Sequence, residues 1–110
     1  MADKTFDDTM KFAIMVAAKQ GWVLNPDEEF TKSLVEGLET NWNRYGYFLC
    51  PCRDTEGSRE ADAAVICPCK PSWSDVAERG HCFCALYLDK AFVASGKTPS
   101  SIPDRSAQYR

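Results

Sequence analysis

The fold and the chemistry are decided by residues 50–84, CPCRDTEGSREADAAVICPCKPSWSDVAERGHCFC, which contain all six cysteines of the chain. The cysteines form three Cys-X-Cys pairs: Cys50-Pro51-Cys52, Cys67-Pro68-Cys69 and Cys82-Phe83-Cys84. In an extended segment, residues i and i+2 point to the same face, so each pair is predicted to present two sulfurs side by side. A disulfide within such a pair would be strained, because the Cα separation lies near the upper limit for that bond. Each sulfur therefore needs a partner in another pair or a metal.

Two assignments of the six thiols are natural. The first is three disulfides between pairs. The second places four thiolates on a metal centre, since tetrahedral zinc and a [4Fe-4S] cluster both accept four cysteines, and it leaves two thiols beside the metal. The N-terminus carries Asp3, Asp7 and Asp8 rather than a basic lead into an apolar stretch, so no secretory signal is expected. Because reducing compartments disfavour structural disulfides, we favour the metal centre over a secreted disulfide framework.

Size and composition indicate one small globular domain. The chain has 110 residues, of which 45% are hydrophobic and 26% charged, values typical of a folded protein with a modest core. Its longest apolar run, Phe12 to Ala18, is far shorter than the ~20 residues that span a bilayer. We therefore expect a soluble, cytoplasmic protein with no membrane contact.

The charges are unevenly distributed around a net charge of -3. Residues 1–40 contain four lysines and eight acidic residues, whereas the remainder contains nine basic and eight acidic residues. No cluster of lysine or arginine suggests nucleic-acid binding. The slightly positive cysteine half would suit an acidic electron donor.

The order Cys-Pro-Cys, Cys-Pro-Cys, Cys-X-Cys resembles the catalytic chain of ferredoxin:thioredoxin reductase and the wider ferredoxin:disulfide reductases, whose catalytic chains are about this short. The resemblance implies a [4Fe-4S] cluster held by one cysteine of the first pair, both of the second and one of the third: Cys50, Cys67, Cys69 and Cys82. It also implies a redox-active disulfide between Cys52 and Cys84. By the same implication, Cys52 is the exposed attacking thiol and Cys84 lies on the cluster side.

The activity that this resemblance implies is ferredoxin-dependent reduction of thioredoxin or another protein disulfide, in two one-electron steps. Ferredoxin would be the electron donor, and the resemblance leaves open whether a second, variable-type subunit is needed. Two alternatives are a non-enzymatic iron-sulfur electron carrier and a structural zinc module. Zinc sites more often use Cys-X2-Cys spacing, which this chain lacks.

Two residues beside the pairs are candidates for supporting roles. The family usually has histidine in the middle of the third pair, but this chain has Phe83 there and its only histidine, His81, just before Cys82. His81 is therefore the candidate acid–base group, with a structural role as the alternative. Arg53 follows Cys52 directly, and a neighbouring cation lowers the pKa of a thiol.

The predicted fold is mainly α, a single domain of short helices and loops wrapped around the cluster. A first helix is expected to be capped by Thr5 or Asp7, to end before Gly21, and to bury Phe6, Met10, Ala13, Ile14 and Ala17. A second is expected to have Asn25 as its cap and Pro26 in its first turn, to run to about Asn41, and to bury Phe30, Leu34, Leu38 and Trp42. Residues 43–49 should then lead in extended form into Cys50, with a turn at Gly46 and with Tyr47, Phe48 and Leu49 shielding the cluster from solvent.

Two shorter helices are predicted between the pairs. Ser58 should cap one that runs through Ala64, and Ser72 should cap another, in a capping box with Asp75, that Gly80 closes. Residues 85–88 should form a strand or a helical turn. Residues 1–94 would then be the catalytic iron-sulfur domain and residues 95–110 a loose C-terminal tail.

Overall fold

The computed structural model describes residues 3–109, and about half of them are helical. In this part of the chain the α-helices are α1 (Phe6–Gln20), α2 (Glu28–Tyr45), α3 (Ser72–Arg79) and α4 (Lys90–Ala94). Short 3-10 turns lie at Ala63–Val65 and Ser106–Gln108, and two strands, β1 (Val23–Leu24) and β2 (Tyr87–Leu88), form a small sheet. The prediction of a mainly helical fold is confirmed. None of the helices described has the length and apolar character needed to cross a membrane.

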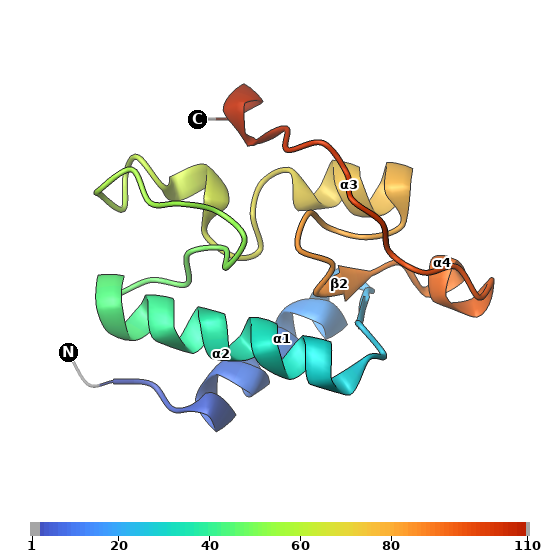
Figure 1. Ribbon diagram of the computed structural model, residues 1–110, viewed down its shortest axis with the longest axis horizontal. Coiled ribbons are helices and arrows are strands. Elements are labelled where there is room, and N and C mark those ends of the chain that lie inside the picture. The colour runs from blue at the N-terminus through green and yellow to red at the C-terminus, as the bar shows by residue number, and fades with distance from the viewer. Residues whose placement is uncertain (1–2, 110) are drawn as a thin grey trace.

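Figure 1 shows how these elements surround the cysteine segment. Helices α1 and α2 pack against each other and form the base of the molecule. The loops that carry the three cysteine pairs lie on one side of α2, together with α3, and the last part of the chain runs across α3. The cysteines are thus held between the α1–α2 layer and the C-terminal segment.

Helix α1 begins as predicted and buries a slightly different face. Thr5 accepts a hydrogen bond from the backbone N–H of Asp8, whose carboxylate accepts the N–H of Thr5 in return. The helix ends at Gly21, which adopts a left-handed conformation with φ of 76°. The prediction that Ile14 belongs to the core is wrong, because its side chain is 52% exposed. The buried residues are Thr9, Ala13, Val16 and Ala17, a stripe from which position 14 is turned away.

Helix α2 begins and ends later than predicted. Its N-cap is Asp27, whose side chain accepts the N–H of Phe30, and the predicted cap, Asn25, has another use. The Asn25 amide donates to the carbonyl of Ala85, and its oxygen accepts the N–H of Asp27. The helix continues to Tyr45, so the prediction that residues 43–45 are extended is wrong, whereas the turn at Gly46 is confirmed by its left-handed φ of 85°.

The core side of α2 is partly as predicted. Leu34 and Leu38 are buried and Trp42 packs against the core, but Phe30 is 39% exposed. Phe30 lies in the first turn of the helix, next to a surface pocket, and so misses the core.

The two helices predicted between the cysteine pairs differ from expectation at their starts. Ser58 accepts the N–H of Ala61, but only a short 3-10 turn follows. Ser72 is the first residue of α3 rather than its cap, and its hydroxyl lies 3.0 Å from the sulfur of Cys69. The predicted capping box with Asp75 is absent, since the Asp75 carboxylate is buried and pairs with Arg105. Gly80 ends α3 as predicted.

The small sheet joins the end of α1 to the third cysteine pair. Strand β1 pairs antiparallel with β2 in the register Val23 to Leu88 and Leu24 to Tyr87. Of the two alternatives for residues 85–88, the strand is therefore observed, over its last two residues. Ala85, between Cys84 and β2, has a φ of 62°, which is unusual for a residue other than glycine.

The hydrophobic core includes the cysteines themselves. Four of them belong to one buried cluster with residues of both long helices and β2: Cys50, Cys67, Cys82 and Cys84. Phe48 stacks on Phe12 at 4.3 Å and contacts Trp42 at 4.8 Å, between ring centroids. The predicted burial of Tyr47, Phe48 and Leu49 is confirmed. Apolar side chains therefore separate most of the sulfurs from water.

The C-terminal segment forms hydrogen bonds and ion pairs with the rest of the molecule. The backbone N–H of Ser100 donates to His81, and the carboxylate of Asp104 pairs with Arg53 at 3.2 Å. Arg105 reaches α3, where it lies 3.0 Å from the Asp75 carboxylate and 2.9 Å from that of Glu78. Residues 100–106, in the segment that the sequence predicts to be loose, are thus connected both to the cysteine loops and to α3.

Candidate active site

The Cys-X-Cys pairs lie in turns, not in the extended chain that we predicted. The N–H of Arg53 donates to the carbonyl of Cys50, and the N–H of Ala85 donates to that of Cys82, which closes the chain around the first and third pairs. The peptide bond between Cys67 and Pro68 is cis. Because a turn does not keep residues i and i+2 on one face, the two sulfurs of a pair can meet different surroundings.

The six cysteines divide by exposure. None of them forms a disulfide, and Cys52 is the exposed one. The four predicted cluster ligands are buried, with exposed fractions of 3% for Cys50, 9% for Cys67, 4% for Cys69 and 2% for Cys82. Cys84 is also buried, and its sulfur lies 3.8 Å from that of Cys50. One thiol therefore faces solvent and the other five point inward.

Hydrogen bonds reach the sulfurs from three directions. The hydroxyl of Tyr87 lies 3.2 Å from the sulfur of Cys67, and the Tyr87 N–H donates to Cys82 at 3.4 Å. The hydroxyl of Ser72 is the neighbour of Cys69. On the remaining side, the Arg53 guanidinium donates through one nitrogen to Cys69 at 3.0 Å. Such bonds to sulfur are among the features by which a protein controls a metal–thiolate centre.

The surroundings shift the thiol pKa values in opposite directions. The Cys84 thiol acts as a hydrogen-bond donor, which lowers the pKa of Cys52, and Arg53 adds a smaller effect of the same sign. The pKa of Cys84 is correspondingly raised, chiefly by its hydrogen bonds with Cys50 and Cys52. Burial raises the pKa of Cys67. The exposed thiol is thus the one more readily ionised of the Cys52 and Cys84 pair.

His81 does not face the sulfurs through its ring nitrogens. The side chain is 1% exposed, and its Nε2 accepts the backbone N–H of Ser100 at 3.3 Å. Nδ1 must then carry the proton, and it donates to the carbonyl of Cys82 at 2.8 Å. Both ring nitrogens are therefore bonded to backbone.

Arg53 contacts more of the site than its position beside Cys52 suggested. Its side chain is 3% exposed. The nitrogen that donates to Cys69 also lies 3.5 Å from the sulfur of Cys50, and the other side of the guanidinium binds Asp104. The guanidinium carbon lies 4.4 Å from the ring centroid of Phe83, the central residue of the third pair.

Sequence reasoning missed three residues that support the sulfurs. Ser72 stands three positions after Cys69, a spacing that could have suggested the contact. Tyr87 and Asp104 gave no local signal, because Tyr87 is 20 residues from Cys67 and Asp104 is 51 residues from Arg53.

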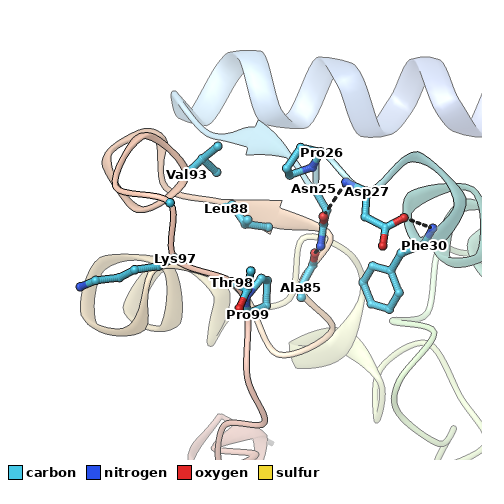
Figure 2. A pocket seen from close by; sticks show the side chains of 11 residues that line it. Asn25, Pro26, Asp27, Phe30, Ala85, Leu88, Val93, Lys97, Thr98 and Pro99 are labelled. Atoms are coloured by element: carbon cyan, nitrogen blue, oxygen red, sulfur yellow. Dashed lines mark hydrogen bonds between the residues drawn. The ribbon is translucent and has the colours of Figure 1, made fainter.

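A surface pocket of about 480 Å³ lies behind the third pair (Figure 2). It is lined by Asn25 and Phe30, which lie before and within the first turn of α2, by Ala85 and Leu88, and by residues 96–99. Figure 2 shows the Asn25 side chain reaching toward Ala85 in its wall. No cysteine lines this pocket, so it is separate from the group of sulfurs.

The donor set is of a kind that a [4Fe-4S] cluster accepts. Such a cluster takes four cysteine thiolates, each on a different iron. The four predicted ligands are buried, and hydrogen-bonding groups lie beside the sulfurs of Cys67 and Cys69. Within residues 3–109, no group of three His, Cys, Asp or Glu side chains is placed to hold a single metal ion.

Comparison with known proteins shows the family of the chain. A family model described as the ferredoxin thioredoxin reductase catalytic beta chain matches residues 1–106. The ferredoxin-thioredoxin reductase catalytic chain of Guillardia theta is 35% identical over 92 residues, which cover 80% of this chain and 86% of that protein. The chloroplastic catalytic chain of Arabidopsis thaliana is 30% identical over 104 residues, covering 91% of this chain and 68% of that protein. This chain therefore belongs to the family of ferredoxin thioredoxin reductase catalytic beta chains.

Proposed function

We propose that this protein is a ferredoxin-dependent disulfide reductase whose working thiols are Cys52 and Cys84. One observation carries the proposal: Cys52 is the exposed thiol of the six, whereas Cys84 is buried and its sulfur lies 3.8 Å from the buried sulfur of Cys50. Electrons could thus enter from the buried sulfurs and leave through a single exposed one.

In this proposal the cluster ligands are the other four cysteines: Cys50, Cys67, Cys69 and Cys82. When bound there, a [4Fe-4S] cluster would supply electrons one at a time. Tyr87, Ser72 and Arg53 would orient the ligand sulfurs through their hydrogen bonds. The apolar side chains of residues 47–49 would limit access of water.

The thiol chemistry follows from the exposure and pKa of the two working cysteines. Two electrons and two protons convert the Cys52–Cys84 disulfide to two thiols. The Cys52 thiolate then attacks one sulfur of a protein disulfide, so that a mixed disulfide forms and the other substrate sulfur leaves and takes a proton. The Cys84 sulfur attacks Cys52 in turn, which releases the second substrate thiol and restores the Cys52–Cys84 disulfide. Exposure and a lowered pKa support Cys52 as the attacking group.

The contacts of His81 support its structural alternative rather than proton transfer. Because its two ring nitrogens bind the carbonyl of Cys82 and the N–H of Ser100, the side chain holds the third cysteine pair against the C-terminal segment. We assign His81 a positioning role in the same site.

The partners in this proposal are ferredoxin as electron donor and thioredoxin, or a protein disulfide like it, as acceptor. The names of the relatives support both, since they are ferredoxin-thioredoxin reductase catalytic chains. The words "catalytic chain" also support association with a second, variable-type subunit. A reducing compartment such as the cytoplasm, or the chloroplast given for the Arabidopsis protein, would suit this chemistry.

The proposal is tested by purifying the protein without oxygen, measuring iron and sulfide, and assaying ferredoxin-driven reduction of a panel of protein disulfides. Cys52→Ser and Cys84→Ser are expected to keep iron and to lose disulfide reduction, whereas Cys69→Ser is expected to lose iron. An electron carrier would keep its activity in the Cys52→Ser variant. A colourless protein that contains zinc and no iron would rule the proposal out in favour of a structural module.

A further inference from the structure

Arg53 is a buried cation placed at the meeting point of the three cysteine pairs. One guanidinium nitrogen donates to a sulfur of the first pair, Cys50, and to a sulfur of the second, Cys69. The face of the guanidinium lies over Phe83 in the third pair.

A cation with so little exposure must have negative partners, because an unpaired buried charge is strongly destabilising. Asp104 provides one carboxylate, which accepts from the Nε and from one terminal nitrogen of Arg53. The other terminal nitrogen is directed at the sulfurs. Arg53 is therefore placed to stabilise negative charge on those sulfurs, and hydrogen bonds that involve a charged group are the stronger kind.

Asp104 belongs to residues 99–106, which we name the C-terminal strap. The strap is fixed on both sides of Asp104: Ser100 donates to His81, and Arg105 pairs with the buried carboxylate of Asp75 on α3. Ser106 donates its N–H to the same Asp104 oxygen that accepts from Arg53, at 2.9 Å. The carboxylate that holds Arg53 is thus itself oriented by neighbouring bonds.

We propose that Arg53 sets the reduction potential of the [4Fe-4S] cluster, and that Asp104 keeps Arg53 in place, so that the C-terminal strap is part of the redox site. This inference rests on the proposed function. A positive charge and hydrogen bonds at ligand sulfurs stabilise the more negatively charged, reduced state of a cluster, and so raise its potential. Arg53 acts here as a positioning residue, through the sulfurs of Cys50 and Cys69.

The test is a spectroscopic redox titration of the purified, cluster-loaded protein. Arg53→Gln is expected to lower the midpoint potential. Arg53→Lys, which keeps the charge but cannot bind two sulfurs and a carboxylate at once, is expected to lower it by less. The matched control is Arg59→Gln, since Arg59 is an exposed arginine of the same loop, and it should leave the potential unchanged. Unchanged potentials in both Arg53 variants would overturn the inference.

A double-mutant cycle tests the part assigned to Asp104. Asp104→Asn is expected to shift the potential in the wild-type background and to have a much smaller effect in Arg53→Gln. An equal shift in both backgrounds would show that Asp104 does not act through Arg53 and would overturn this part. If Arg53→Gln fails to retain iron, the same double-mutant cycle with Arg53→Lys decides whether Asp104 acts through Arg53.

Hydrogen exchange gives a readout that does not depend on the cluster. Backbone amides of the C-terminal strap should exchange faster in Arg53→Gln and in Asp104→Asn than in the wild type, and at the wild-type rate in Arg59→Gln. Unchanged exchange rates in these two variants would contradict the role assigned to the C-terminal strap. A wild-type protein without iron would overturn the proposed function and the effect on potential, whereas a wild-type protein with iron and unchanged variant potentials would overturn the inference alone.

Discussion

Asp62 binds several parts of the loop after the first cysteine pair. Its carboxylate is fully buried and accepts hydrogen bonds from the hydroxyls of Tyr47 and Thr55, both at 2.5 Å, and from the N–H of Glu56 at 2.8 Å. The bond to Asp62 is the main reason why the pKa of Tyr47 is raised. The loop between Arg53 and the second pair is therefore closed around one carboxylate.

Replacing this carboxylate should be costly. Asp62→Ala is expected to lower the free energy of unfolding by about 3 kcal/mol, because the buried donors lose a charged acceptor. The neighbouring Glu60 is exposed, and Glu60→Ala should change the stability by less than about 0.5 kcal/mol. Anaerobic urea unfolding measures both. Similar losses in the two variants would show that the loop does not depend on Asp62.

At the scale of elements, Gly80 marks a close approach between the end of α3 and α4. It ends α3 with a φ of 87°, and a Cβ at this position would clash with the Phe92 ring in α4. Gly21 ends α1 in the same conformation but has nothing within 4 Å of a Cβ. Comparing substitutions at the two glycines therefore separates the energetic cost of a left-handed backbone from the cost of a steric clash.

Alanine at the two positions should have unequal effects. Gly21→Ala is expected to cost about 1 kcal/mol, from the left-handed conformation alone. Gly80→Ala is expected to cost about 2 kcal/mol more, because Phe92 must move. Thermal melting of both variants checks this difference. Equal losses would mean that α4 adjusts freely around position 80.

The same elements show how far the sequence could predict the fold. Thr5, Gly46 and Gly80 were identified correctly because a cap depends on a few adjacent residues. The start of α2 was predicted wrongly, because Asn25 and Asp27 are both good N-cap residues. Which of them caps the helix depends on the hydrogen bond between Asn25 and Ala85, 60 residues away. Strand β1, with two residues, and helix α4, with five, were missed because they are too short to show a hydrophobic periodicity.

For the candidate site, the sequence pointed to the cysteines and to their neighbours Arg53 and His81, but not to the more distant side chains that contact the sulfurs. The Cys-X-Cys pattern is local and was read directly, although the extended geometry predicted for it was wrong. The partners that control the sulfurs come from distant positions, as with Tyr87 and Asp104. A contact of this kind depends on how the whole chain folds, so no short window of sequence contains it.

At the scale of the whole molecule, α3 and the C-terminal strap are joined through a buried acid. Asp75 is fully buried, and within the described residues neither of its oxygens has a hydrogen bond, although the Nε of Arg105 lies 3.0 Å away. Burial raises the pKa of Asp75 above its usual value, despite the opposing effect of Arg105. The ionised carboxylate is thus less favourable in the folded protein than in the unfolded chain.

This shift predicts a pH-dependent effect on stability. A carboxyl with a raised pKa contributes most to stability below its ordinary pKa of 3.8, and the contribution is lost as the pH rises through the folded value. The melting temperature of Asp75→Asn, relative to the wild type, should therefore increase between about pH 4 and pH 7. Glu78→Gln removes the exposed partner of Arg105 and should show little such trend. A difference in melting temperature between Asp75→Asn and the wild type that does not change with pH would contradict the expectation.

The attachment of the last residues to the redox site also has a practical side. A purification tag fused after position 110 would lie close in sequence to the turn at Ser106–Gln108. This turn begins two residues after Asp104, whose carboxylate binds Arg53. At the opposite end, the backbone of Lys4 forms two hydrogen bonds with the Asn43 side chain on α2, and neither bond involves the C-terminal strap. Expression vectors and immobilisation chemistry for electrochemistry should therefore use the amino end, so that the electrode signal reports the unmodified centre.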